Sequence, residues 1–307
     1  MASHSPSSPR LSVVVLGSGI SAGVPAWNDG SPRALRARAG DPAMPRRRGA
    51  ALAVSADGVR YSLIEAPLHL AESLARDPRF APAPGTRHVP IDTLVLTCAE
   101  LDACAGALAF ARGLSLRIAS PHALREALVD HDAGFRALEA SWTGHAFDRP
   151  FPLDREGHLE ARLFPLPGPV PEALRERAPM AGRARAGIRI TDRRTGSRLV
   201  FAPRIARYDS ATLAELRAAD VRLVDGTCLA EEEGRLIHPG VQGTRDLGHL
   251  PIDGRDGSLV WLSGMAGRSI YVHLAASNPA CETDGKDWAR IHEAGVLVAH
   301  DGLELAL

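Results

Sequence analysis

The sequence has no long apolar run and no paired cysteines. None of its apolar stretches reaches the roughly 18 residues that a membrane-spanning helix needs. The first ten residues, MASHSPSSPR, contain no apolar segment, so we expect no signal peptide there. The four cysteines are scattered without a C-x-x-C spacing: Cys98, Cys104, Cys228 and Cys281. We therefore expect a reduced, cytoplasmic protein in which each cysteine is a small buried apolar side chain.

Neither sign of charge is in excess. The chain has 36 Lys and Arg residues against 36 Asp and Glu residues, and Lys286 is the only lysine. This balance predicts that neither nucleic acid nor an anionic membrane is a partner. The arginine-rich runs Arg46–Arg48 and Arg183–Arg189 are expected to be solvated loops.

Three common site signatures are missing. The sequence contains no Walker-type phosphate loop and no G-x-S-x-G elbow. The glycines from Gly17 to Gly23 have the spacing G-x-G-x-x-x-G, and Pro25 follows too soon for a helix to begin, which argues against a dinucleotide site. Ser18 lies in this turn, but a serine nucleophile needs a nearby base and the sequence indicates none.

The patterns that are present predict a mixed α/β domain. Apolar or alternating runs predict strands at 11–16, 50–54, 61–64, 93–97, 115–119, 159–164, 187–191, 198–201, 222–224, 269–272 and 296–299. Helices are expected at 68–75, 103–111, 121–130, 211–219 and 288–293. Asp57-Gly58 between two strands is a hairpin signal. Two mixed sheets between layers of helices fit this order better than one doubly wound sheet, with residues 1–10 disordered and 11–307 in a single domain.

Polar side chains gather where the predicted strands end. The segment TLVLTCAELDACAGAL places Cys98, Glu100 and Asp102 directly after a buried strand, and His273 follows another strand. Cys, His and carboxylate side chains that converge from strand ends are suited to hold a metal ion, and His249 is a further candidate. The alternatives are that Asp102 caps the following helix and that each histidine is merely solvated or caps a helix.

The order of several motifs resembles the pyrroloquinoline quinone (PQQ) biosynthesis protein B family, PqqB. The opening VLGSGISAGVPAWN is similar to the family's VLGSAAGGGxPQWN. The chain's VDGT and GTRDLGH resemble the family's DGT and TGRDMGH. VHLAASNP resembles HINNTNP, and VAHDGL near the end also fits. The matches are collinear from about residue 11 to the last residue.

This resemblance implies a metallo-β-lactamase fold, an αββα sandwich of two mixed sheets flanked by helices. The family is regarded as an iron-dependent hydroxylase of a tyrosine-derived PQQ precursor, and an older role has it carry PQQ or its precursor to the periplasm. The expected partner is therefore a small-molecule or short-peptide precursor. Members also bind a structural zinc ion through cysteines after a Trp-Asn pair. The residues directly after Trp27-Asn28 include no cysteine, so we expect that zinc site to be absent.

The chain departs from the family in its metal-binding loop, which reads LTDSQIDHTTGLL in the family. Cys98 replaces the first Asp, Glu100 replaces Gln, Asp102 is retained, and Ala103 replaces the loop histidine. The family's NASPD segment aligns with EAPLH, so that His69 replaces an acidic residue, and the rim around Ala202-Pro203-Arg204 has also changed.

Two main hypotheses follow from these matches and departures. In the first, the chain is a metal-dependent enzyme with Fe(II), or alternatively zinc, bound by Asp102, His249 and His273, with Glu100 or Cys98 replacing the lost donors. Asp246 and Arg245 would be catalytic groups that orient the metal site or substrate. The substrate is expected to contact Ser18, Asp225, Thr227 and Asn278.

In the second hypothesis, the chain is a divergent paralogue that binds a small molecule or partner without catalysis. Loss of the loop histidine and of the zinc cysteines favours this hypothesis. The fold can be retained without the activity, because fold alone does not fix function. Hydrolysis by a metal-bound hydroxide is the least expected activity without the loop histidine. A homodimer is the default expectation for the oligomeric state.

Overall fold

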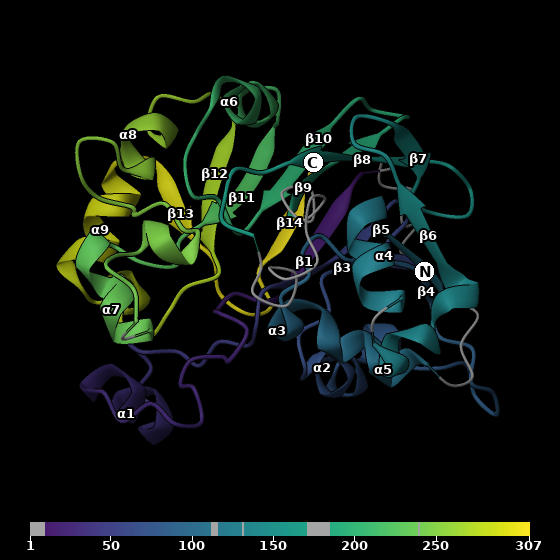
Figure 1. Cartoon of the computed structure of the whole chain (residues 1–307), viewed down its shortest axis with the longest axis horizontal. Coiled ribbons are helices and arrows are strands. Elements are labelled where there is room, and N and C mark those ends of the chain that lie inside the picture. The colour runs from purple at the N-terminus through teal and green to yellow at the C-terminus, as the bar shows by residue number, and fades with distance from the viewer. Residues whose placement is uncertain (1–9, 112–115, 131, 171–184, 239) are drawn as a thin grey trace, which may run out of the picture.

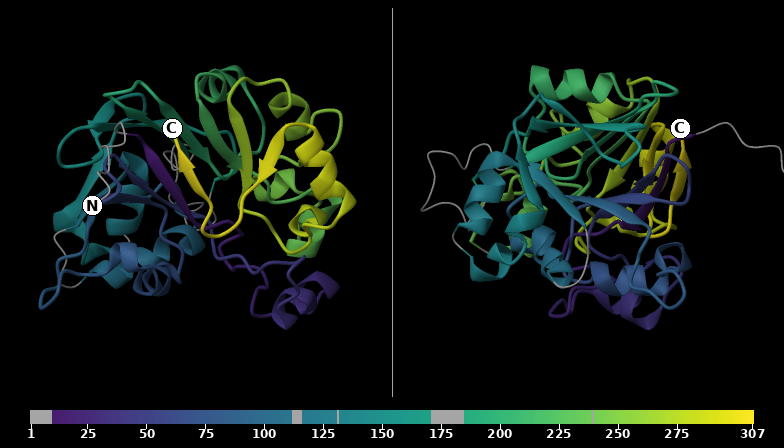
Figure 2. Two further views of the ribbon diagram at one scale, coloured as in Figure 1. Left: turned by 180° about the vertical axis from the view of Figure 1, so that it is seen from behind. Right: turned by 90° about the vertical axis from the view of Figure 1, so that its right-hand side faces the viewer.

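Two sheets face each other at the centre of the molecule. The computed structural model describes residues 10–111, 116–130, 132–170, 185–238 and 240–307, apart from the side chain of Asp102. Within these residues the strands form two seven-stranded sheets with helices on both outer sides (Figures 1 and 2). The first sheet has the order β14 (Glu304–Ala306), β1 (Ser12–Gly17), β2 (Ala51–Ser55), β3 (Tyr61–Ile64), β4 (Ile91–Val95), β5 (Arg117–Pro121) and β6 (Trp142–His145). The second has the order β13 (Val296–Val298), β12 (Arg268–Val272), β11 (Val221–Asp225), β10 (Arg198–Ala202), β9 (Ala186–Asp192), β8 (Leu159–Pro165) and β7 (Pro150–Pro152).

The helices form the outer layers, which confirms the predicted αββα architecture. The α-helices are α1 (Pro32–Ala39), α2 (Leu70–Arg76), α3 (Leu101–Cys104), α4 (His122–Val129), α5 (Ala133–Arg136), α6 (Ser210–Arg217), α7 (Gly234–Ile237), α8 (Ser258–Leu262) and α9 (Lys286–Glu293). Short 3-10 helices are η1 (Pro78–Phe80), η2 (Ala105–Phe110), η3 (Glu139–Ser141), η6 (Glu231–Glu233), η7 (Arg245–Leu247) and η8 (Pro279–Cys281). No helix among these described segments is both long and apolar enough to cross a membrane.

Three apolar clusters correspond to the three interfaces of the sandwich. Between the sheets, Val13 and Leu52 pack in one cluster with Ile188 and Leu223. A second cluster joins the first sheet to helices α2, α4 and α5, and a third joins the second sheet to α6, α8 and α9. The continuous apolar run of β1 is explained by this arrangement, because both faces of that strand are buried.

Both sheets combine parallel and antiparallel pairs, as the sequence predicted. Strands β1, β2 and β3 pair antiparallel, and Gly58 supplies the positive φ of +76° in the turn after Asp57. Strands β10 to β13 pair parallel. Their carboxyl ends therefore meet at one edge of the second sheet, where Asp225 ends β11 and His273 follows β12.

The first and last parts of the chain are paired with each other. Strand β1 pairs antiparallel with β14, with Ser12 opposite Ala306. The turn after β1 is closed by Asp301, whose Oδ1 accepts hydrogen bonds from the backbone N–H (2.9 Å) and hydroxyl (2.8 Å) of Ser18. No helix follows this turn directly, since α1 begins only at Pro32. The glycine-rich turn is thus a sheet-edge connection and not a dinucleotide site.

Helix α1 is attached to the C-terminal part of the chain by ion pairs, chiefly those to Glu282. Arg33 and Arg36 of this helix both form ion pairs with Glu282, and Arg36 also pairs with Asp41 at 2.7 Å. The helix has Ser31 as its N-cap and ends at Gly40, which has a φ of +76°. This segment follows Trp27-Asn28, so ion pairs hold the region in which the family carries its zinc cysteines.

The helix after the β4 loop is shorter than predicted. A regular helix over 103–111 was expected, but α3 ends at Cys104 and continues as the 3-10 helix η2. Gly106 explains the change, because its N–H donates to Ala66 O (2.8 Å) and an added Cβ would lie 2.1 Å from Pro67 O. Asp102 lies inside α3, whose N-cap is Glu100, so the alternative that Asp102 is the N-cap is wrong.

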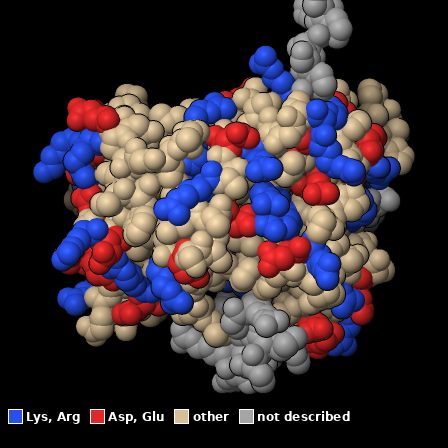
Figure 3. Space-filling model, turned by 90° about the horizontal axis from the view of Figure 1, so that it is seen from above, with Lys and Arg blue, Asp and Glu red and all other residues tan. Residues whose placement is uncertain are grey.

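The expectation that both arginine runs are solvated loops is wrong in part. Arg185 and Arg47 each have an exposed fraction of 3%, and Arg189 lies in β9. Arg183 lies outside the described residues. On the face shown in Figure 3, basic and acidic side chains lie next to each other and not in separate areas, in keeping with the balanced charge.

Candidate metal centre

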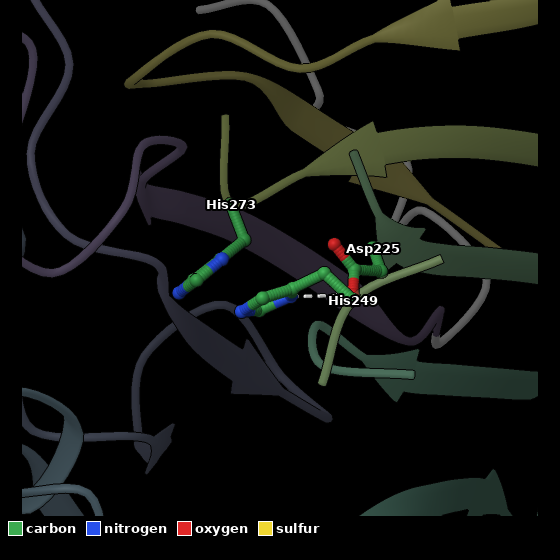
Figure 4. A group of neighbouring side chains, drawn as sticks. All are labelled: Asp225, His249 and His273. Atoms are coloured by element: carbon green, nitrogen blue, oxygen red, sulfur yellow. Dashed lines mark hydrogen bonds and ion pairs between the residues drawn. The ribbon is translucent and has the colours of Figure 1, made fainter. Parts of the chain in front are cut away.

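The structure brings Asp225, His249 and His273 together at the edge of the second sheet. Asp225 is the last residue of β11, His273 follows β12, and His249 lies two residues after η7. Their ligand atoms all lie within 4.8 Å of one another, and all three residues are buried (Figure 4). The two imidazole rings stack with centroids 5.2 Å apart. This is a group of side chains that could hold a metal ion.

Hydrogen bonds fix the protonation of both imidazoles. The Thr227 hydroxyl donates to Asp225 Oδ1 (2.7 Å), so its oxygen must accept from the Nδ1–H of His273, at 2.8 Å. The Nδ1–H of His249 donates to Asp225 Oδ2 (2.7 Å). Both rings therefore carry their proton on Nδ1, a tautomer assigned from the network, and both Nε2 atoms keep a lone pair. The two Nε2 atoms point the same way, away from Asp225 (Figure 4).

The Nε2 atom of His273 is buried and has no hydrogen-bond partner in the described structure. Burial, together with the nearby charge of Arg204, holds the pKa of His273 well below its usual value. The ring is therefore neutral at pH 7, as a metal ligand must be. A buried nitrogen lone pair without a partner is costly, and a bound ion removes that cost.

His273 also has a strained backbone. Its φ is +65°, in the left-handed region that non-glycine residues rarely adopt. Backbone hydrogen bonds on either side impose this conformation: Val272 O accepts from Gly226 N (2.8 Å), and Leu274 N donates to Ser18 O (3.0 Å). Strain of this kind costs on the order of 1–3 kcal/mol and is concentrated at functional sites.

Asp225 orients the histidines, and both of its carboxylate oxygens accept hydrogen bonds in this structure. Its Oδ1 accepts from the N–H (3.0 Å) and the hydroxyl of Thr227. Its Oδ2 accepts from Ile205 N (2.9 Å) and from His249 Nδ1. A carboxylate that holds the Nδ1–H of a histidine is the usual outer partner of a metal-binding imidazole. Asp225 and Thr227, expected at the substrate, are thus buried behind the histidines.

Glu100, the expected replacement donor of the β4 loop, is engaged by two arginines. Its Oε1 lies 2.6 Å from an Arg185 nitrogen, and its Oε2 lies 3.1 Å from Nε of Arg204. Burial opposes ionisation, but Arg204 and Arg185 together hold the pKa of Glu100 below its usual value. This carboxylate is therefore ionised and pairs with two guanidinium groups in the described structure, and its role as a metal ligand stays a prediction.

Cys98, the other replacement donor, is a buried thiol. Its exposed fraction is 1%, and burial raises its pKa to about 12. Metals bind the thiolate, so Cys98 would have to lose its proton to an ion in order to act as a ligand, and this role stays a prediction. The backbone of Cys98 forms a bridge with that of Arg185. The side chain of Asp102 lies outside the described residues, so its assignment as a ligand stays a prediction.

Sequence reasoning missed a buried charged group next to these residues: Glu65, Arg185 and Arg204. Glu65 is fully buried with a φ of +70°, and burial raises its pKa to about 7 despite Arg204, which lies 3.9 Å away. Thr97 donates to Glu65 Oε1. The sequence feature that could have identified these residues is their position after predicted strands. Glu65 follows β3 and Arg204 follows β10, at the same edge as the histidines.

The remaining predicted site residues have other partners. Ser18 bonds with Asp301 and Arg47, and Asn278 Nδ2 donates to Gly226 O (2.8 Å), so both hold loops. Arg245 is exposed and pairs with Glu231, and exposed Asp246 accepts from Gln242 N (2.9 Å). The structure therefore does not bring these four residues to the two Nε2 atoms.

The residues present fit a metal centre that depends on two histidines. Two imidazoles, each held through Nδ1, offer two adjacent nitrogen donors in a buried site. On the side of the β4 loop, Glu100 is paired with Arg185 and Arg204, which bring positive charge to this side. The two histidines would hold the ion, with remaining positions for water or substrate.

Comparison with known proteins agrees with this geometry. Residues 60–274 match the Beta-lactamase superfamily domain. Over 97% of its length the chain is 31% identical to the full Coenzyme PQQ synthesis protein B of Xanthomonas oryzae pv. oryzae, and 33% identical to that of Ruegeria pomeroyi. Zn(2+)-bound PqqB from Methylobacterium extorquens superposes with a TM-score of 0.89 at 30% identity, over 96% of this chain and 100% of that one. A diphosphatase of the PhnP family, 20% identical with a TM-score of 0.65 over 96% and 97% of the two chains, shares the fold. With its fold, its histidine pair and these relatives in agreement, the chain belongs to the Coenzyme PQQ synthesis protein B family of the beta-lactamase superfamily.

Proposed function

We propose that this chain acts in PQQ biosynthesis and hydroxylates a tyrosine-derived precursor at a metal ion held by His249 and His273. Family membership supports the pathway. One observation supports the metal: Asp225 and Thr227 hold the Nδ1 atoms of both rings, and Nε2 of His273 is buried without a partner in the described structure. Ferrous iron in such a site supplies oxygen activation, and zinc would supply Lewis-acid chemistry.

The chain's own residues would keep the histidines aligned. Asp225 holds the proton on His249 Nδ1 and stabilises positive charge on that ring. Thr227 does the same for the orientation of His273. The proposed substrate is a small-molecule or short-peptide precursor, and Arg204 and Arg185 lie close enough to act on the pKa of His273 while both are paired with Glu100.

Metal content tests this proposal directly. Purified protein loaded anaerobically with ferrous iron should bind about one ion per chain. The variant His273→Ala should bind none, while His88→Ala, which changes an exposed histidine, should bind as the parent does. A Glu-Tyr dipeptide should then drive oxygen uptake by the loaded parent. A parent protein that retains neither iron nor zinc would overturn the proposal.

A second candidate is a role in binding the precursor or PQQ without catalysis, which includes the older role as a carrier. The ion pairs of Glu100 with Arg185 and Arg204 favour it, because guanidinium groups lie where the family's metal-binding loop lies. Calorimetry with metal-free protein separates the two. Tight binding of the dipeptide or PQQ without metal, and no oxygen uptake with metal, would support the binding role.

The proposal includes a cytoplasmic location and a homodimer. Scattered cysteines, all free and buried in the structure, support a reducing compartment. Light scattering during gel filtration tests the dimer, and fractionation of cells tests the location. A monomer at micromolar concentration would contradict the homodimer, and recovery from the periplasm would contradict the cytoplasmic location.

A further inference from the structure

An arginine-rich pocket lies outside the histidine centre. It has a volume of about 610 Å³, which falls in the range of small-molecule sites. Its lining includes five arginines, two carboxylates and two rings: Arg38, Arg46, Arg47, Arg48, Arg76, Glu72, Asp301, Trp27 and His69. Asp225, His249 and His273 do not line it. The family comparisons, the sequence motifs and the proposed reaction leave this pocket without a role.

Three of these arginines form no ion pair with a carboxylate among the described residues. Arg38 donates to the carbonyls of Ala26, Trp27 and Asp29. Arg46 donates to those of Ala37 (3.1 Å) and Arg38 (2.7 Å). These bonds position the guanidinium groups without neutralising them.

Arg47 is the third, and it is buried. It donates to Ser18 Oγ (3.0 Å) and to the Ala299 carbonyl, with an exposed fraction of 3%. Burial raises the pKa of Asp301, and the charge of Arg47 partly offsets this rise. The same carboxylate also lies near Arg48, so one negative charge is shared by two arginines. A buried guanidinium without a counter-charge of its own is costly unless an anion compensates it.

The two carboxylates of the pocket are already matched. Arg76 pairs with Glu72 one helical turn away, and Arg48 lies 3.9 Å from Asp301. The lining therefore keeps a surplus of three positive charges. His69 adds no negative charge, and its Nε2 accepts from Gly49 N at 2.6 Å.

We propose that this pocket binds a small anion with two or more negative charges, carried by carboxylate or phosphate groups. Guanidinium groups recognise both kinds of oxyanion through paired N–H donors. The concave shape and limited volume suit a small molecule and not a nucleic acid, which requires an extended basic surface. Trp27, with an exposed fraction of 89%, lies in the lining and offers an apolar face and a fluorescent reporter.

Calorimetry with two probes tests the proposal and identifies the kind of anion. Benzene-1,3,5-tricarboxylate represents carboxylates and inorganic pyrophosphate represents phosphates, with acetate as the single-charge comparison. At least one of the first two should bind, quench Trp27 fluorescence, and weaken at about 0.5 M salt because charges are screened. Quenching should disappear in Trp27→Phe.

Variants locate the binding. Arg46→Gln should weaken the bound probe about tenfold, the effect expected when one charge-assisted contact is lost. Arg46 also holds carbonyls at the end of α1, so Arg48→Gln, which disturbs only a long ion pair, provides a second variant. Arg87→Gln changes an exposed arginine outside the pocket and should have no effect.

Three results would overturn the proposal: no binding of either probe, acetate binding as tight as theirs, or equal weakening in Arg87→Gln. The proposed function is tested separately, because loss of the metal in His273→Ala should leave probe binding in this pocket unchanged.

Discussion

Thr227 Oγ lies 2.8 Å from Nδ1 of His273 and 2.7 Å from a carboxylate oxygen of Asp225, so one hydroxyl determines which nitrogen of His273 is free. Because the hydroxyl donates to Asp225, it can only accept from the imidazole. The free Nε2 atom is thus a consequence of a side chain that does not touch the candidate metal position.

Replacement of Thr227 by Val keeps the shape and removes the hydroxyl. We expect metal affinity to fall about 10–100-fold, as is usual when an outer partner of a metal-binding histidine is lost. Thr227→Ser should retain most of the affinity because it keeps the oxygen. Competition with a chromophoric chelator measures the affinity. Equal affinity in the Val variant and the parent would show that Thr227 does not control the tautomer.

His273 allows backbone strain and metal binding to be separated. His273→Gly and His273→Ala should both lose the metal. The Gly variant should be more stable than the Ala variant by about 1 kcal/mol, because a φ of +65° strains every residue with a Cβ. Urea denaturation of the two metal-free variants checks this difference. An Ala variant as stable as the Gly variant would contradict the strain.

Glu65 should make stability depend on pH in a defined direction. Burial raises its pKa from 4.5 to about 7, so the folded state binds this proton more tightly than the unfolded state does. Its contribution is fully present below pH 4.5 and is lost as pH rises to about 7. Glu65→Gln cannot ionise, so the variant should gain stability relative to the parent across this window, by up to about 3 kcal/mol.

Urea denaturation of both proteins at about pH 5 and about pH 8 measures this gain. The lowered pKa of His273 makes the free energy of unfolding change with pH in the opposite direction. His273 is present in both proteins, so its contribution cancels in the comparison. A difference between parent and variant that is the same at both pH values would contradict the raised pKa of Glu65.

Cys98 should prove irrelevant to the metal. With a thiol pKa of about 12 and an exposed fraction of 1%, it should resist alkylation by iodoacetamide in the folded protein and react only after denaturation. Cys98→Ala should keep the metal stoichiometry of the parent, whereas His249→Ala should not. Loss of metal from Cys98→Ala, measured by elemental analysis, would restore the cysteine as a ligand.

The fold was predictable because its signals are local. A continuous apolar run marked β1, and Asp57-Gly58 marked the turn between β2 and β3. The short strand β6, WTGH, and the edge strand β7, PFP, were missed because neither has enough residues to show a period. The length of α3 depended on a distant contact of Gly106 with Ala66 and Pro67, which no local pattern reveals.

The site was predictable only in part. His249 and His273 were identified from their positions and from the family motifs, and the structure brings them together. The pairing of Glu100 was not predicted because a sequence does not show which arginines reach a carboxylate. Arg185 and Arg204 come from different parts of the chain, and arginines in polar runs are ordinarily solvated. Buried pairing of this kind is a tertiary property.

The pairing of β1 with β14 has a consequence for the order of events during synthesis on the ribosome. Strand β1, the Ser18 turn and helix α1 depend on Ala306, Asp301 and Glu282, which are synthesised long after them. The nascent segment that contains β1 and α1 must therefore wait, incompletely paired, until these distant residues have been made. A ribosome-bound chain stalled before Glu282 should remain sensitive to protease between residues 31 and 48, and a chain that extends past Ala306 should lose that sensitivity.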